Sequence, residues 1–215
     1  IRHSVSKLSH IHFVSNDDAA KRLLQMGEME TSIFNIGSPD IDIMFSDELP
    51  SLERVKDYYQ IPFETFAIVM FHPVTTEAKE MHHHTDNFIT ALLKDTHNYV
   101  VIYPNNDLGS TYIIESYIKL KNNPRFRVFP SLRFEYFLTL LKNAQFIIGN
   151  SSAGIREAPY YGIPIINIGS RQQNRTLHAE IINVDYDKKS IQYSLQIIHN
   201  QKKKAYQNDF GNGNS

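Results

Sequence analysis

The sequence predicts an α/β protein built on a Rossmann-like parallel sheet. From about residue 66 onward, short apolar runs alternate with longer amphipathic segments; the runs lie at residues 66–71, 99–103, 126–129, 146–148, 163–168 and 181–184. Most of the runs are continuous, which is typical of parallel strands that helices cover on both faces. Strands that alternate with helices in this way are joined by right-handed crossovers within one sheet.

The segments between the first four runs have helical periodicity. Apolar residues recur every three or four positions over residues 76–93, 112–120 and 134–141. We therefore expect a helix in each of these segments, as a crossover between two parallel strands requires.

The first sixty residues have a different organisation. We expect a strand over 10–14, a helix over 17–26 that Asn16 caps, a strand over 33–36 and a helix over 51–59. Two strands and one helix cannot bury a core alone. Residues 1–40 are therefore expected to be the end of an incomplete N-terminal Rossmann-like domain. The expected domains that follow are a C-terminal Rossmann-like domain at 41–201 and a tail at 202–215.

Composition excludes several classes of function. The 215 residues include 22 Lys and Arg against 23 Asp and Glu, a formal charge of −1, so nucleic acid and anionic membranes are not expected partners. The sequence has no Cys, which excludes disulfides, thiolate metal sites and a cysteine nucleophile. The longest apolar run, residues 66–71, is too short to cross a bilayer. We expect a cytoplasmic protein.

The segment Gly149-Asn150-Ser151-Ser152 follows an apolar strand and opens a helix. Unpaired N–H groups at a helix start, together with the two serine hydroxyls, can hold a phosphate. Glu157, further into that helix, can accept hydrogen bonds from both hydroxyls of a ribose. The alternative is a serine N-cap on an ordinary helix, with Glu157 as a surface charge.

Three other polar segments also follow predicted strands. His72 comes directly after residues 66–71 and suits acid–base work or charge stabilisation, although a strand-end His is more often a structural residue. Asn105 can contact a nucleotide or form a turn, and Arg171 can pair with a diphosphate or remain a loop cation. Because a parallel sheet collects the residues after its strands at one edge, we expect a single site there.

Two histidine patterns suggest a metal site, and we discount both. Consecutive helical residues such as 82–84 point in different directions and cannot share one ion. His10 and His12 would lie on one face of a strand but have no evident third ligand. We expect neither a metal nor a cofactor.

The sequence resembles the UDP-N-acetylglucosamine 2-epimerase family, and in particular its hydrolysing branch, which forms N-acetylmannosamine for sialic-acid-type sugars. The resemblance is carried by residues 1–10, 35–40, 72–76, 103–105, 149–157 and 168–172. It implies a glycosyltransferase-B-type fold of two Rossmann-like domains, with the active site between them. It also implies elimination of UDP from UDP-N-acetylglucosamine, followed by addition of water with inversion at C2.

The resemblance assigns roles to individual residues. His72 would act in catalysis beside the diphosphate of UDP, and His3 would reach the sugar. The UDP-binding residues that it implies are His72, Asn105, Leu132 (by its backbone, at uracil), Ser151, Ser152, Glu157 and Arg171.

The resemblance also places the acids that move the proton at C2 upstream of residue 1. We therefore expect this chain to bind UDP weakly without turnover, and the whole protein to be a homo-oligomeric enzyme, a dimer or a tetramer. The alternatives are a glycosyltransferase of the same fold, which needs an acceptor, and a non-catalytic nucleotide-sugar-binding domain. The sugar can instead be a diacetamido variant, or the nucleotide GDP.

Overall fold

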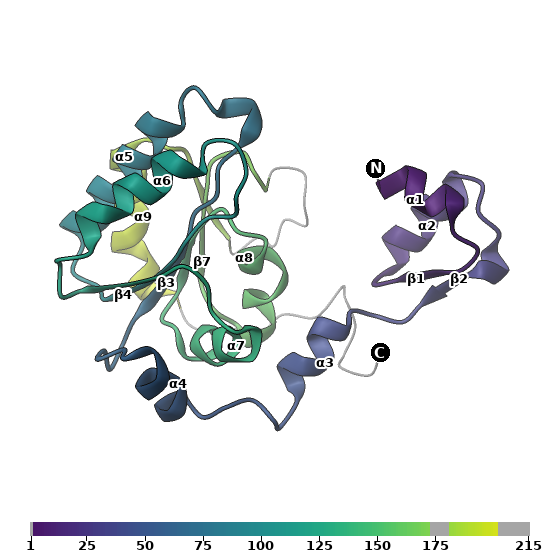
Figure 1. Ribbon diagram of the computed structural model, residues 1–215, viewed down its shortest axis with the longest axis horizontal. Helices are drawn as coiled ribbons and strands as arrows, with labels where there is room; N and C mark the ends of the chain where they lie inside the picture. Colours follow the sequence, from purple (N-terminus) through teal and green to yellow (C-terminus); the bar gives the residue numbers. More distant parts are fainter. Residues whose placement is uncertain (1, 173–180, 202–215) are drawn as a thin grey trace. The chain divides into compact units, whose positions relative to one another are not determined.

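The computed structural model describes residues 2–172 and 181–201 (Figure 1). These residues divide into two compact units, one up to Leu49 and the other from Pro50 onward. The assignment of residues 1–40 to an incomplete N-terminal domain and of residues 41–201 to a C-terminal domain stays a prediction. The expected tail at 202–215 lies outside the described residues.

The first unit contains a parallel βαβ motif. Its elements are α1 (Arg2–Leu8), β1 (His12–Val14), α2 (Asp17–Gln25), a 3-10 turn (Glu30–Ser32), β2 (Ile33–Asn35) and α3 (Pro39–Phe45). β1 pairs with β2 in parallel, and Asn16 accepts a hydrogen bond from the N–H of Ala19 at 2.9 Å, which confirms the predicted cap. β1 begins at His12, so His10 does not lie on the strand as expected.

The second unit alternates strands and helices. Its elements are α4 (Leu52–Tyr59), β3 (Ala67–Met70), α5 (Met81–Lys94), β4 (Tyr99–Ile102), α6 (Ser110–Tyr117), β5 (Phe126–Phe129), α7 (Phe134–Asn143), β6 (Ile147–Gly149), α8 (Ala153–Arg156), β7 (Ile165–Ile168), β8 (Ile182–Val184) and α9 (Lys188–Ile197). Short 3-10 turns lie at Thr75–Glu77, Ile118–Leu120, Ala158–Tyr161 and Ile198–Asn200.

The second unit's sheet is parallel throughout, as predicted. Its strand order is β5-β4-β3-β6-β7-β8, and the neighbours β3 and β6 are far apart in the chain, with Met70 opposite Gly149. The strand order therefore reverses direction between β3 and β6. Open α/β sheets bind ligands at such a switch point, outside the carboxyl ends of the strands.

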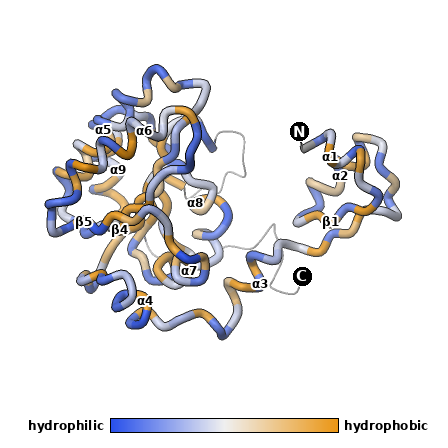
Figure 2. Tube along the Cα trace, in the orientation of Figure 1, coloured by the Kyte–Doolittle hydropathy of each residue, from blue (hydrophilic) through white to orange (hydrophobic). Residues whose placement is uncertain are grey.

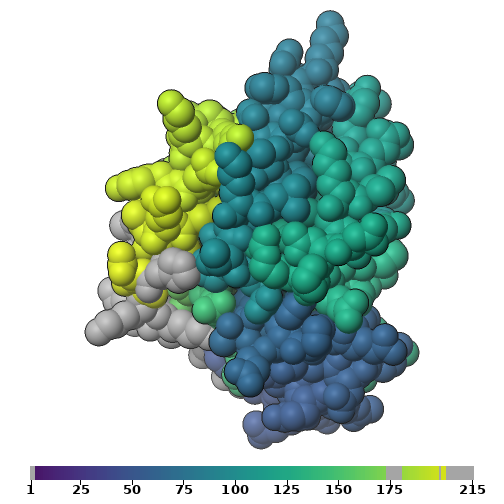
Figure 3. All heavy atoms as spheres, turned by 90° about the vertical axis from the view of Figure 1, so that its left-hand side faces the viewer, coloured from purple at the N-terminus to yellow at the C-terminus, as the bar shows by residue number. Residues whose placement is uncertain are grey.

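Helices cover both faces of this sheet. α5 packs between α6 and α9 on one face (Figure 3), and α7 and α8 lie on the other (Figure 1). Because both faces are covered, successive strand residues such as Ala67, Ile68 and Val69 are all buried. The sheet is accordingly apolar along its strands (Figure 2), which explains the continuous runs in the sequence.

Two helices differ from the prediction. The helix expected from residue 76 begins at Met81, because Thr75–Glu77 forms a 3-10 turn whose Glu77 contacts Ser170 in another loop. The helix expected after Gly149 is α8, which has four residues. A 3-10 turn that contains Pro159 follows α8. Proline has no N–H to continue the α-helical pattern, so α8 cannot extend past it.

Candidate functional site

The expected site residues lie along the carboxyl edge of the second unit's sheet. His72 follows β3, Asn105 follows β4, Leu132 follows β5, Ser151 follows β6 and Arg171 follows β7. Given the strand order, the residues lie along this edge in the spatial order Leu132, Asn105, His72, Ser151, Arg171. His72 and Ser151 therefore follow the two strands that meet at the switch point.

His72 is held through its backbone by the side chain of Asn150. The main-chain N–H of His72 donates to Oδ1 of Asn150 at 2.6 Å, and Nδ2 of Asn150 donates to the carbonyl of His72 at 2.8 Å. Asn150 is completely buried. The turn after β6 and the segment after β3 are therefore fixed to each other by a paired hydrogen bond.

The imidazole of His72 is neutral near pH 7. Burial, and then the positive charge of Arg171, lower the pKa of His72 from 6.5 to about 4, while Asn105 and Asp107 act in the opposite direction. The main-chain N–H of Asn105 donates to Nδ1 of His72 at 3.1 Å. A nitrogen that accepts a hydrogen bond carries no proton, which assigns the proton of the neutral ring to Nε2.

The turn after β6 requires glycine. Gly149 has φ +139°, and a Cβ there would lie 2.1 Å from the carbonyl oxygen of Met70. This close approach lets the N–H of Asn150 donate to the same oxygen at 3.1 Å. It also brings the following residues, Ser151 and Ser152, to the sheet edge, where both are half-buried.

The two serines contribute hydroxyl groups to this edge. Oγ of Ser151 accepts a hydrogen bond from the N–H of Ala153 at 3.3 Å. α8 has four residues, so few peptide dipoles are aligned there and the helix dipole is small. The capacity of this turn to hold an anion therefore depends mainly on its hydroxyls and on the neighbouring cation, Arg171.

Arg171 and Gln172 contact the same turn. Nη1 of Arg171 donates to the carbonyl of Asn150 at 3.1 Å, and Nε2 of Gln172 donates to it at 2.7 Å. Arg171 is half-buried, whereas Gln172 is buried. Asn150 thus connects the loops after β3, β6 and β7 through its side chain and its backbone.

The remaining expected residues lie further from this junction. Asn105 is exposed, and its side chain donates to the carboxylate of Asp107. Leu132 is half-buried, and the next residue, Arg133, donates its N–H to the hydroxyl of Tyr59 at 3.0 Å. These positions are compatible with nucleotide contacts, which stay predictions.

Two further expected site residues, Glu157 and His3, differ in how far they are buried. Glu157 follows the last residue of α8 and is 9% exposed, so it is not the surface charge that the alternative predicted. His3 is exposed on α1 in the first unit, and its contact with the sugar stays a prediction.

The family model described as UDP-N-acetylglucosamine 2-epimerase matches residues 1–215. The chain belongs to this family. It is 54% identical over 196 residues to a UDP-N-acetylglucosamine 2-epimerase of Neisseria meningitidis serogroup B, covering 91% of this chain and 52% of that protein. It is 31% identical over 214 residues to a hydrolysing UDP-N,N'-diacetylbacillosamine 2-epimerase of Legionella pneumophila, covering 99% of this chain and 57% of that protein.

The fold of this epimerase-family chain is shared with solved structures. A UDP-GlcNAc 2-epimerase from Neisseria meningitidis, bound to UDP-GlcNAc, superposes with a TM-score of 0.70 at 18% identity, covering 97% of this chain and 60% of the other. This likeness confirms the expected Rossmann-like α/β fold class. The chain spans about half the length of the curated relatives it matches.

Sequence reasoning missed two polar residues of the site in this epimerase-family chain. Asn150 and Gln172 were not expected to act there, yet both are buried polar residues that connect loops of the site. A buried amide side chain is costly unless it is hydrogen-bonded. The signal for Asn150 was available, because it directly follows an apolar strand and precedes two serines.

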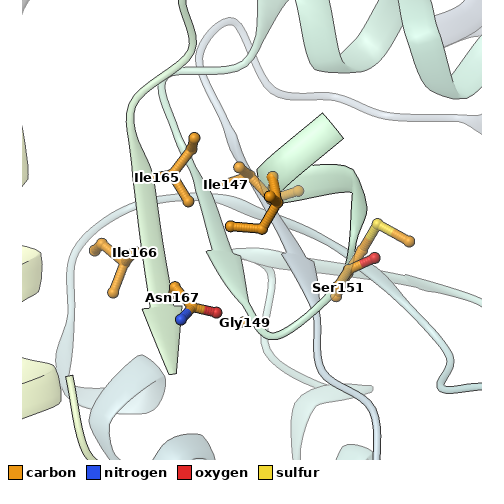
Figure 4. A pocket seen from close by; sticks show the side chains of 9 residues that line it. Ile147, Gly149, Ser151, Ile165, Ile166 and Asn167 are labelled. Carbon is orange, nitrogen blue, oxygen red and sulfur yellow. The ribbon is translucent and has the colours of Figure 1, made fainter. Parts of the chain in front are cut away.

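A small cavity lies beside this turn, between β6, β7 and α8 (Figure 4). Ile147, Gly154 and Ile165 are among the residues that line it, and its volume of about 10 Å³ suits at most one water molecule. A nucleotide therefore cannot enter this cavity, and the candidate site is the adjacent sheet edge.

Within residues 2–172 and 181–201, no three His, Cys, Asp or Glu side chains come together as a metal site would require. Helices in the same ranges are all too short or too polar to span a membrane. The histidines at 82–84 point apart: His83 bonds Asn87, while His84 stacks on Tyr186.

Proposed function

We propose that this chain contributes the UDP-binding half of a hydrolysing UDP-N-acetylglucosamine 2-epimerase, which converts UDP-N-acetylglucosamine and water to N-acetylmannosamine and UDP. The observation that carries the proposal is the junction of three loops at the switch point of the sheet. There Asn150 joins the backbone of His72, whose neutral ring has its proton on Nε2, to the turn that carries the two serines. Arg171 donates to the carbonyl of the same Asn150. Family membership and the UDP-N-acetylglucosamine 2-epimerase of Neisseria meningitidis support an epimerase that acts on this substrate. The hydrolysing 2-epimerase of Legionella pneumophila supports the hydrolysing branch.

The first chemical step is the elimination of UDP. A base removes the proton at C2, a C1–C2 double bond forms, and the C1–O bond breaks with its electron pair moving to the β-phosphate. The hydroxyls of Ser151 and Ser152 and the guanidinium of Arg171 stabilise the charge that develops on the phosphate oxygens. His72 donates a hydrogen bond from Nε2 to the same diphosphate.

The second step is hydration of the glycal-like intermediate. Water adds its oxygen to C1, and a proton returns to C2 on the opposite face, which gives N-acetylmannosamine. At the other end of the nucleotide, the backbone at Leu132 contacts uracil, Asn105 contacts the nucleotide and Glu157 accepts the ribose hydroxyls.

The acids that transfer the C2 proton are not assigned to these 215 residues. Because the resemblance places them upstream of residue 1, the chain by itself binds UDP without releasing N-acetylmannosamine. The whole protein is a homo-oligomeric enzyme in this proposal and acts in the biosynthesis of sialic-acid-type sugars.

Product analysis tests this function. The whole protein and the 215-residue chain are each incubated with UDP-N-acetylglucosamine, its diacetamido counterpart or a GDP sugar, without any acceptor, and the products are followed by ¹H NMR. We expect N-acetylmannosamine and UDP from the whole protein with UDP-N-acetylglucosamine, and no product from the chain alone. Preference for the diacetamido sugar, the reaction named for the Legionella relative, would overturn the sugar assignment. Turnover that requires an acceptor would instead identify a glycosyltransferase.

A further inference from the structure

The loops after β3 and β7 are joined by a direct polar contact, in addition to their shared contacts with Asn150. The hydroxyl of Ser170 donates to Oε1 of Glu77. Glu77 lies five residues after His72 in the sequence, and Ser170 directly precedes Arg171. One carboxylate therefore connects the segment that carries the imidazole to the segment that carries the guanidinium.

Tyr186, which follows β8, packs against Gly169, the residue before Ser170, and against His84. A Cβ on Gly169 (φ +71°) would lie 2.0 Å from Cζ of Tyr186, so the glycine backbone rests directly on the ring. The ring of Tyr186 also stacks on His84, with centroids 3.8 Å apart and planes 4° from parallel. The turn at Gly169 and Ser170 is thus enclosed by an aromatic ring and the Glu77 carboxylate.

The surroundings of the Glu77 carboxylate are polar and partly buried. Nδ1 of His84 lies 4.0 Å from Oε2 of Glu77, with side-chain exposures of 16% and 28%. Burial raises the pKa of Tyr186 to about 12, and hydrogen bonding to Glu77 and its charge add to this effect. The hydroxyl of Tyr186 is therefore neutral near pH 7.

The Glu77–Ser170 contact restrains Arg171 because Ser170 directly precedes it in the chain. Glu77 fixes Ser170, and Tyr186 fixes Gly169. The backbone that precedes Arg171 is therefore restrained, which sets the direction of its side chain. Arg171 then reaches the carbonyl of Asn150. Without the carboxylate, the hydroxyl of Ser170 loses its acceptor, and the turn keeps the contact of Gly169 with Tyr186 and its hydrogen bond to the carbonyl of Val184.

We propose that Glu77 is a positioning residue for diphosphate binding: through Ser170 it orients Arg171 beside His72 and the serine turn. This inference rests on the proposed function and assigns to that site a residue that does not itself touch the nucleotide. Partners that orient a binding group are commonly worth 10- to 100-fold in affinity at metal centres. A single hydrogen bond that acts through the neighbouring residue belongs near the lower end of that range.

The test measures binding of UDP by calorimetry and of uridine by NMR titration, with the 215-residue chain. We expect Glu77→Ala to weaken UDP about tenfold and to leave uridine unchanged, because only the diphosphate contacts Arg171. Glu77→Gln keeps an oxygen that accepts from Ser170 and should restore UDP affinity to within about twofold of wild type. Glu115→Gln, an exposed acid on α6, is the matched control and should bind as wild type does.

A double-mutant cycle separates positioning from a general structural role. In an Arg171→Ala background, Glu77→Ala should cause less than about a twofold further loss of UDP affinity. Ser170→Ala removes the same contact from its other side and should reproduce the loss, which keeps the test valid if Glu77→Ala does not fold.

Three results would overturn the inference. If wild type binds UDP and both Glu77→Ala and Ser170→Ala bind it equally well, Glu77 has no positioning role while the proposed function stands. An equal loss of UDP and uridine, or an undiminished loss in the Arg171→Ala background, shows a structural role alone. If wild type does not bind UDP, the proposed function and this inference fail together.

Discussion

The main-chain N–H of Asn105 donates to Nδ1 of His72 at 3.1 Å, across the neighbouring strands β3 and β4. This one contact fixes the orientation of the ring and its tautomer. A ring with its proton on Nε2 acts as a hydrogen-bond donor without carrying a charge. His72 therefore suits the donation of a hydrogen bond to a departing phosphate better than the formation of an ion pair with it.

Substitutions of His72 distinguish its two nitrogens. His72→Asn keeps an acceptor near the position of Nδ1 and loses the donor, whereas His72→Gln places an N–H donor near the position of Nε2. We expect His72→Asn to weaken UDP about 10- to 100-fold, as for loss of a hydrogen bond to a charged group, and His72→Gln to weaken it less. Calorimetry checks the order, and equal affinities for the two variants would contradict the assigned tautomer.

The low pKa of His72 makes stability depend on pH. The unfolded chain takes up a proton near pH 6.5, whereas folded His72 does so near pH 4. Between these values the unfolded state binds more protons, so the free energy of unfolding falls as the pH falls from 6.5 toward 4.

Thermal unfolding of wild type and His72→Asn at pH 7.5 and pH 5 measures this effect. Wild type should lose about 2 kcal/mol more than the variant between the two pH values. Other titrating groups, including His84, are common to both proteins, so the difference reports His72. An identical pH dependence would show that the ring is not buried as described.

Gly149 is expected to tolerate no side chain. Gly149→Ala would place a Cβ 2.1 Å from the oxygen of Met70 and should reduce the free energy of unfolding by more than about 3 kcal/mol. Gly154→Ala is the matched control: its Cβ would lie 3.3 Å from a side-chain atom of Ile165, and a helical alanine is favourable by up to about 1 kcal/mol. Chemical denaturation of both variants checks the contrast, and similar losses would contradict the close approach.

Tyr59 supports the loop expected to contact uracil. Its hydroxyl accepts the N–H of Arg133, directly after Leu132, while its ring packs edge-to-face on Phe129 at 5.2 Å. Tyr59→Phe removes the hydroxyl and keeps the ring. We expect UDP and uridine to bind about two- to fivefold more weakly and pyrophosphate to bind unchanged. Weaker pyrophosphate binding would contradict a role confined to the base.

The sequence predicted the strands better than their arrangement. The run at 99–103 contains β4, whose four residues are all buried, because a strand covered on both faces leaves a continuous apolar signal. The neighbours β3 and β6 could not be predicted from periodicity, because their pairing joins residues about 80 positions apart. The contact of Asn150 with His72 spans 78 positions and depends on that pairing.

Local signals were weakest where other parts of the chain decide the structure. α1 and α3 were not predicted, and α8 is shorter than expected because a 3-10 turn with Pro159 follows it. Edge residues such as His72 and Arg171 were predicted because they follow strands. Gln172 and Glu77 were missed because their roles come from contacts between loops.

Titration of wild type and a Ser151→Ala/Ser152→Ala variant with UDP and with uridine measures whether the turn after β6 holds the diphosphate. We expect wild type to bind UDP at least about tenfold more tightly than uridine, and the variant to lose most of this difference, as for removal of two hydrogen bonds to charged oxygens. Uridine affinity should be the same for both proteins. Equal binding of UDP by the two proteins would show that the diphosphate lies elsewhere.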